Sequence, residues 1–181
     1  MAASTNWCSL SVMTCSTKGL NIGQIALFGM LGALTFGAKF VMSMLPNIEP
    51  VSLLVMVFAV VMGAKALYPI FIYIMLEILV YGIGDWNVMY LYLWPLLWLV
   101  AWLLRGTKHP LVWAVVSGSF GLMFGALCSP VYYFMGGWEM VAAKWVSGLG
   151  FDLMHCVGNF VIALLLFVPL RDLLKKLYRV S

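Results

Sequence analysis

The chain has 181 residues, of which 65% are hydrophobic and only 9% are charged. This composition excludes an ordinary soluble domain, because too few polar side chains are present to cover a water-facing surface. The mean hydropathy of +1.06 predicts an all-α integral membrane protein, and the small net charge of +4 gives no reason to expect nucleic-acid binding.

The few charged residues lie between apolar stretches, and their signs alternate from one boundary to the next. Basic residues mark every second boundary: Lys18, Lys65, Arg105, Lys108, Arg171, Lys175, Lys176 and Arg179. Acidic residues mark the boundaries between them: Glu49, Asp85 and Glu139. Because basic loops stay in the cytoplasm during insertion, the pattern predicts a bundle of six transmembrane helices with cytoplasmic N- and C-termini.

Residues 1–19 are polar and rich in Ser and Thr. They lack the basic segment and apolar core of a signal peptide, so we expect a flexible cytoplasmic leader. A single membrane domain is then expected over 20–181, ending in an amphipathic basic tail. No phosphate-binding loop of the form GxxxxGK followed by Ser or Thr occurs, so the chain cannot by itself be a complete ATP-driven pump.

The first span is expected over 22–45, and it contains a stripe of small residues. Gly29, Ala33 and Gly37 recur at intervals of four residues, which places them on one helix face. Such a face lets a second helix approach closely. Lys39 lies in the outer half of this span, where we expect its long side chain to snorkel towards the interface.

The first outer loop contains Asn47 and Glu49. Spans two and three are expected over 51–63 and 67–81, on either side of a basic inner turn. The third span contains an isolated acid, Glu77, whose burial in hydrocarbon is costly. Its role is open between a ligand contact and the lining of a polar cavity.

Polar and aromatic residues follow the third span. The second outer loop and the start of the fourth span, 88–104, supply candidate ligand contacts: Asp85, Trp86, Asn87, Tyr90 and Trp94. Aromatic rings offer stacking faces to a flat ligand. Tyr and Trp also gather at bilayer interfaces without any ligand, so both interpretations stay open.

The fifth span, 111–133, ends in further aromatic residues. Tyr132 and Tyr133 close it, and Trp138 follows in a longer outer segment. Here too, ligand contact and interfacial anchoring are equally compatible with the sequence. A short helix is expected within the outer segment, over 138–146.

The sixth span, 151–170, opens with three polar residues. Asp152, His155 and Asn159 are three and four residues apart, so they share one helix face. A carboxylate, an imidazole and an amide on one face are suited to fixing a polar ligand. The alternative is that they form hydrogen bonds with neighbouring helices and close the bundle.

The sequence does not favour an enzyme. No Ser or Cys nucleophile has a partner at a recognisable spacing, although Asp152 beside His155 suggests acid–base chemistry. The four cysteines include no CxxC pair, and we expect neither a metal site nor a cofactor. A channel is also disfavoured, because the central layers of the spans are apolar.

Two segments and the overall layout are similar to a known family. The segment LPNIEPVS at 45–52 resembles a segment of the first loop of these proteins. The segment GFDLMHCVGNF at 150–160 resembles a segment of their last helix. The family is the substrate-binding S components of energy-coupling factor (ECF) transporters. The six-span layout over 20–180 also matches. In that family, the surface that docks on the coupling membrane subunit consists of small residues at intervals of four. Gly29, Ala33 and Gly37 have the same spacing, although alanines are more usual at these positions in the family.

The resemblance implies a subunit for uptake of a vitamin or related micronutrient across the plasma membrane of a bacterium. Substrate would bind at the outer side, with the first loop, including Asn47 and Glu49, as a lid and spans four to six as the walls. The implied partners are a transmembrane coupling subunit and two cytoplasmic ATPases, and toppling in the bilayer would deliver the substrate. Cobalamin or another ring-containing vitamin is one implied cargo, and riboflavin, thiamine precursors, pantothenate, pyridoxine-like and queuosine-like compounds stay open.

Two other interpretations compete with this one. A small secondary transporter would work without ATPase partners, although the chain shows no internal repeat of the kind that many such transporters have. A non-transport membrane assembly protein would pack helices and bind no small molecule.

Overall fold

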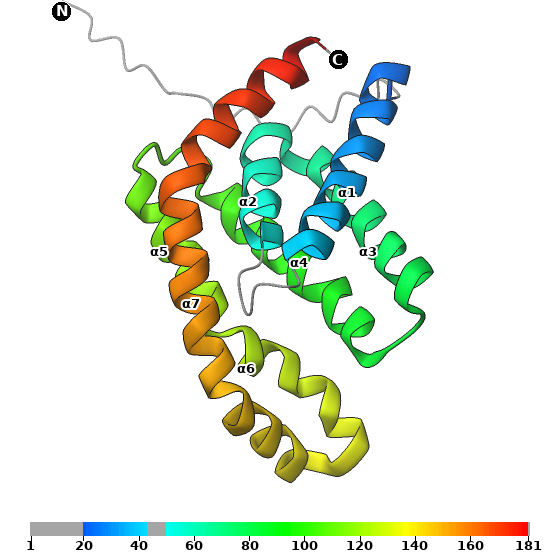
Figure 1. Ribbon diagram of the computed structural model, residues 1–181, viewed down its shortest axis with the longest axis vertical. Helices are drawn as coiled ribbons and strands as arrows, with labels where there is room; N and C mark the ends of the chain where they lie inside the picture. Colours follow the sequence, from blue (N-terminus) through cyan, green and yellow to red (C-terminus); the bar gives the residue numbers. More distant parts are fainter. Residues whose placement is uncertain (1–19, 43–49, 181) are drawn as a thin grey trace, which may run out of the picture.

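The computed structural model describes residues 20–42 and 50–180. Regular structure in those ranges is entirely helical (Figure 1): α1 (Ile22–Met42), α2 (Pro50–Met62), η1 (Gly63–Ala66), α3 (Leu67–Tyr81), α4 (Asp85–Leu103), α5 (Pro110–Leu122), α6 (Phe124–Cys128), η2 (Ser129–Tyr132) and α7 (Tyr133–Val180). The predicted leader at 1–19 and the loop residues Asn47 and Glu49 lie outside the described residues.

The described helices fit a membrane protein. Four helical runs are long and apolar enough to cross a membrane: Ile22–Met42, Pro50–Tyr81, Asp85–Leu103 and Phe124–Val180. Large apolar side chains cover their outer surfaces, as at Leu79, Leu103 and Leu165, which are 82%, 67% and 66% exposed. In water such a surface would be unfavourable, whereas hydrocarbon solvates it. The all-α prediction is confirmed.

The unbroken helical runs are fewer than predicted, because the turn expected between two of the spans is itself helical. In the part of the chain that the structure describes, the four long runs and the shorter α5 make five, not six. The predicted spans two and three are α2 and α3, and they count as one run because the turn between them, η1, is itself 3₁₀-helical. Gly63 supplies the bend with a φ of +60°, a conformation that glycine adopts readily.

The far end of the molecule is also more helical than predicted. The helix expected at 138–146 follows a kink at Gly136 and Gly137, which divides α7 into two helical stretches, and it continues into the predicted sixth span instead of ending at 146. Together, α6 and η2 pack against the first part of α7, and the two segments form a hairpin at one end of the molecule (Figure 1).

The core is built around α2. This helix is apolar on all sides, and Val51, Met56 and Ala59 are fully buried. A helix without a polar face is stable only where other helices surround it. Contacts with α4 and α7 provide that environment, and the central position of α2 is visible in Figure 1.

Glycines allow two pairs of helices to approach closely. A Cβ atom on Gly32 would lie 2.5 Å from Ile72 Cγ2, so α1 and α3 meet at this point. A Cβ atom on Gly121 would lie 2.8 Å from the backbone of His155, where α5 meets α7. Trp113 of α5 also stacks on Phe167 of α7, with ring centroids 4.4 Å apart.

Substitution of Gly32 tests the contact between α1 and α3. Gly32→Leu should lower the free energy of unfolding by about 1–3 kcal/mol, because the added side chain forces the helices apart. Gly29→Leu is the matched control, since nothing lies within 4 Å of the position of its Cβ atom. Thermal unfolding in detergent measures both, and equal melting temperatures for the two variants would contradict this packing.

Candidate ligand site

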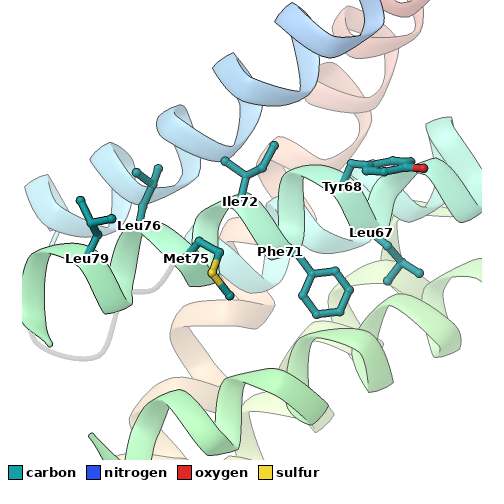
Figure 2. Close-up of a pocket in the computed structure, with 7 residues that line it drawn as sticks. All are labelled: Leu67, Tyr68, Phe71, Ile72, Met75, Leu76 and Leu79. Carbon is teal, nitrogen blue, oxygen red and sulfur yellow. The ribbon is translucent and has the colours of Figure 1, made fainter. Parts of the chain in front are cut away.

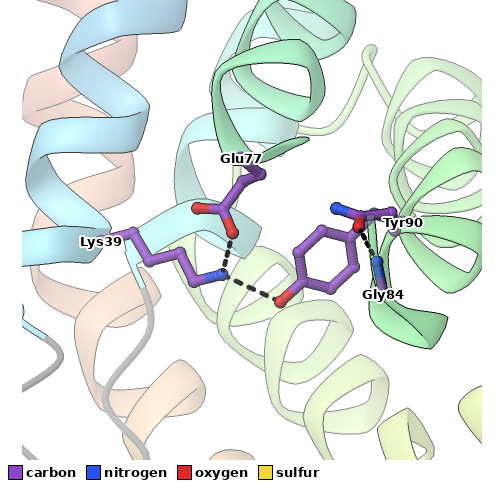
Figure 3. Close-up of polar contacts among 5 residues, drawn as sticks. Lys39, Glu77, Gly84 and Tyr90 are labelled. Carbon is purple, nitrogen blue, oxygen red and sulfur yellow. Dashed lines mark hydrogen bonds and ion pairs between the residues drawn. The ribbon is translucent and has the colours of Figure 1, made fainter. Parts of the chain in front are cut away.

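A buried ion pair joins three helices at the end of the bundle where α3 gives way to α4. Lys39 Nζ of α1 lies 2.9 Å from Glu77 Oε2 of α3 and donates to the Tyr90 hydroxyl of α4 at 3.0 Å (Figure 3). The Lys39 side chain is 20% exposed and that of Glu77 only 2%. Lys39, expected to snorkel, instead points into the protein.

The turn between α3 and α4 positions this cluster. Gly82, with a φ of +81°, ends α3 and donates its N–H to Ile78. Gly84 donates its N–H to Asn87 Oδ1 at 2.7 Å, which closes the first turn of α4 (Figure 3). The tight connection holds the last turns of α3 beside the first turns of α4, and so brings Glu77 close to Tyr90.

Glu77 retains one unsatisfied oxygen. Its Oε2 atom accepts from Lys39, but Oε1 is buried and has no hydrogen-bond partner among the described residues. An unpaired buried acceptor costs about 1–3 kcal/mol, and more when it is charged. The sequence left the role of Glu77 open, and the structure places it at the wall of a pocket.

This pocket has a volume of about 360 Å³ and is lined by Lys39, Glu77, Tyr81, Trp86 and Tyr90. Tyr90 is buried, whereas Trp86 is 39% exposed. The Lys39 ammonium lies 4.7 Å from the centre of the Tyr90 ring, a distance suited to a cation–π contact. The pocket therefore combines one pair of opposite charges with aromatic walls.

A chain of aromatic rings leads from the pocket to α7. Tyr90 and Trp94 have ring centroids 5.3 Å apart, and Trp94 lies 6.3 Å from Phe124. Phe124 stacks on His155, with centroids 5.3 Å apart and planes 11° from parallel. The predicted residues of α4 and α7 are thus connected, through a phenylalanine that the sequence did not single out.

Asp152 lies where α7 meets α6, and Asn159 lies where α7 meets α2. Asp152 Oδ1 accepts from the Gly125 N–H at 2.9 Å, and Asn159 Nδ2 contacts Ser52 Oγ at 3.4 Å. Asp152 is 3% exposed and Asn159 2%. These contacts hold neighbouring helices together, although Asp152 Oδ2 and Asn159 Oδ1 are buried and have no hydrogen-bond partner within 20–42 and 50–180. A role in binding ligand stays a prediction.

Other predicted residues lie around the pocket or away from it. Asp85 accepts from the Tyr132 hydroxyl at 2.7 Å, which ties the start of α4 to η2. Tyr133 and Trp138 contact each other on the hairpin, with ring centroids 5.0 Å apart, and both are exposed. Of the predicted ligand contacts, Trp86 and Tyr90 line the pocket directly.

Lys39 and Tyr81 are the pocket residues that the sequence did not mark as ligand contacts. A signal for Lys39 was present, because two isolated opposite charges in apolar spans are stable mainly when paired. The described residues also contain no group of three His, Cys, Asp or Glu side chains that could hold a metal ion.

The small-residue face of α1 is a separate surface. Ala33 is exposed, and Cβ atoms on Gly29 and Gly37 would meet nothing within 4 Å. This face is therefore open in the described structure. Gly32 is the glycine of α1 that packs against α3.

An apolar groove of about 500 Å³ lies along α3 (Figure 2). Its lining is entirely apolar: Leu67, Tyr68, Phe71, Ile72, Met75, Leu76 and Leu79. The side chains of Met75 and Phe71 project from α3 on one side, while Leu76 and Ile72 point the other way. Such a groove suits lipid chains or another apolar helix better than a polar solute.

Comparison with protein-family models, curated proteins and solved structures gives no match to this chain.

Substitution of Lys39 tests the ion pair. Lys39→Met should lower the free energy of unfolding by about 3–5 kcal/mol, because Glu77 would stay buried without its counter-charge. The double variant Lys39→Met/Glu77→Met should recover most of that loss, since an apolar pair needs no desolvation of charge. Chemical denaturation in detergent measures the free energy of unfolding of the wild-type protein, the single variant and the double variant.

Arg171→Met is the matched control, because its ion pair with Asp172 involves a carboxylate side chain that is 51% exposed. Exposed pairs contribute only about 0–1 kcal/mol. A double variant as unstable as Lys39→Met would show that the charges do not compensate each other.

Proposed function

We propose that this protein is the substrate-specific S component of an ECF-type transporter, which binds a vitamin-like micronutrient and passes it across the membrane with the help of partner subunits. The observation that supports this most is the aromatic pocket beside the Lys39–Glu77 pair, because it offers polar recognition at one end of an otherwise apolar bundle. The sequence segments that resemble the family add independent support.

The basic residues support an orientation in which the pocket faces outwards. Lys65 contacts Gln24 near the start of α1, and Arg105 follows the end of α4. Glu77 and Asp85 lie towards the opposite ends of their helices. By the positive-inside rule, the end with Lys65 and Arg105 is cytoplasmic, so the pocket opens on the outer side of a bacterial plasma membrane.

The open face of α1 supports the existence of a partner subunit. Helices in a bilayer associate through close packing of small residues, because lipid provides no hydrophobic drive for their association. Gly29, Ala33 and Gly37 provide such a face, and the chain itself has no nucleotide-binding loop. In the proposed complex, α1 docks on a transmembrane coupling subunit, and two cytoplasmic ATPases supply the energy.

The internal pairing of charges also suits delivery by toppling. A charge that faces lipid is costly to move through hydrocarbon, by several kcal/mol or more. Lys39 and Glu77 neutralise each other inside the protein, so the body can reorient without moving an unpaired charge of this cluster through lipid.

A thermal-shift screen of the detergent-purified protein against vitamins and their precursors tests substrate binding. A ligand that binds only the folded state should stabilise it by about 4 kcal/mol at a thousandfold excess over its dissociation constant. A folded protein that no compound stabilises would favour the non-transport assembly interpretation over the transport subunit.

Co-purification with ECF coupling and ATPase subunits tests docking. Ala33→Leu should abolish assembly and uptake while leaving ligand binding intact, because bulk on this face prevents close helix approach. Ala143→Leu, at an exposed position on the hairpin part of α7, is the matched control. If Ala33→Leu assembles as well as the control, the α1 face is not the interface.

A further inference from the structure

The last turns of α7, residues 171–180, are fixed to the bundle along one side. Leu174 is 4% exposed and belongs to the apolar core. Leu170 and Tyr178, one turn before and one turn after it, pack against the same core. Because residues four apart share a helix face, these turns follow the bundle as a regular helix, and their other sides point away from it.

The outward sides of these turns separate apolar from charged residues. Leu173, Leu177 and Val180 form an apolar strip, with exposed fractions of 54%, 49% and 90%. The rest of the circumference carries the charged residues of this segment: Arg171, Asp172, Lys175, Lys176 and Arg179. A helix in which an apolar strip lies beside a basic side is typical of a segment at the surface of a bilayer.

Further basic residues gather at this end of the molecule. The start of α1 and the end of α7 both lie here (Figure 1), and Lys65 of η1 contacts Gln24 of α1. Trp98 of α4 donates its indole N–H to the Gly63 carbonyl of η1 at 2.9 Å, so Arg105, which follows α4, lies at the same end. This end of the protein is therefore strongly positive.

Contacts within α7 offset only part of the charge of its last turns. These turns contain four basic residues and one acidic residue, a net charge of +3. Arg171 pairs with Asp172 at 2.9 Å. Asp172 also precedes Lys175 and Lys176 by three and four residues, so it attracts both, but one carboxylate offsets only one positive charge. The helix dipole favours cations in the last turn, and both lysines precede that turn.

We propose that residues 171–180 bind the headgroups of anionic phospholipids at the cytoplasmic surface of the bilayer. The apolar strip enters the boundary of the acyl chains, while Lys175 and Lys176 contact the lipid phosphates. A bilayer supplies hydrocarbon and negative charge side by side, which matches the two outward sides of the helix. This inference goes beyond the proposed function and uses only the orientation that the positive-inside rule gives.

Lipid titration of the detergent-purified full-length protein tests the binding, with native mass spectrometry to count bound lipids. Anionic phosphatidylglycerol is compared with phosphatidylcholine, which has no net charge, at identical acyl chains. Two lysines beside the headgroup should favour phosphatidylglycerol by at least about tenfold. The preference should disappear at about 1 M salt, where the screening length falls to about 3 Å. Equal binding of the two lipids at low salt would overturn the proposal.

Variants that remove or keep the charge locate the bound lipid. Lys175→Gln/Lys176→Gln should lower the affinity for phosphatidylglycerol at least about tenfold and leave that for phosphatidylcholine unchanged. Lys175→Arg/Lys176→Arg should keep the preference, because both positive charges remain. Lys144→Gln is the matched control, since Lys144 is exposed on the hairpin part of the same helix. A preference that survives in the glutamine variant would place the lipid elsewhere.

Two further measurements test the apolar strip and the source of the anion. Leu177→Gln should weaken the binding of both lipids, because it places a polar group against acyl chains. Inorganic phosphate carries charge without hydrocarbon, so it should displace phosphatidylglycerol only at a far higher concentration than the lipid. If phosphate competes at the concentration of the lipid, these turns bind a free anion and the lipid assignment is wrong.

The outcomes also separate lipid binding from protein binding and from the proposed function. If Lys175→Gln/Lys176→Gln keeps its lipid preference but no longer co-purifies with ATPase subunits, these turns contact protein and the lipid assignment is wrong. Loss of the lipid preference with unchanged ligand stabilisation in the thermal-shift screen would support both proposals. A flat thermal-shift screen would count against the transport subunit alone.

Discussion

The ion pair between Lys39 and Glu77 is the contact on which the architecture of the pocket depends. Apolar packing in a bilayer has little directional preference, because lipid chains solvate an apolar helix as well as another helix does. A buried charge, by contrast, must meet its counter-charge. The pair therefore fixes where α1 lies against α3, and the Tyr90 hydroxyl extends the same constraint to α4.

Small residues provide the second constraint, and they serve two purposes on α1. Gly32 allows the backbone of α1 to approach α3, whereas Gly29 and Gly37 face open space. The sequence shows a stripe at intervals of four, but it cannot say which side of a helix is used within the fold. That choice depends on what the neighbouring helix presents, here Ile72 and the Pro69 carbonyl of α3.

The same distinction explains which parts of the structure were predictable. Hydropathy identified the apolar helices, because the length of an apolar run is a local property. The turn at Lys65 was predictable from its charge, but the sequence did not show that a 3₁₀ segment with Gly63 would form it and leave α2 and α3 in one unbroken helical run. The shared inward direction of Asp152 and Asn159 was predictable from helical spacing, but their partners on other helices were not.

The pairing of Lys39 with Glu77 could have been predicted in part. The two residues are 38 positions apart, so no local rule connects them. The rarity of charge in the spans nevertheless makes each isolated acid a candidate partner for each isolated base. The sequence could not show how the carboxylate is hydrogen-bonded: Oε2 accepts from Lys39, whereas Oε1 has no partner in the part of the chain that the structure describes. A buried carboxylate oxygen without a donor is unfavourable, so the contacts of Glu77 Oε2 and of the surrounding apolar helices must offset that cost. The same side chain therefore both fixes the packing of α1 on α3 and limits the stability of the bundle at this point.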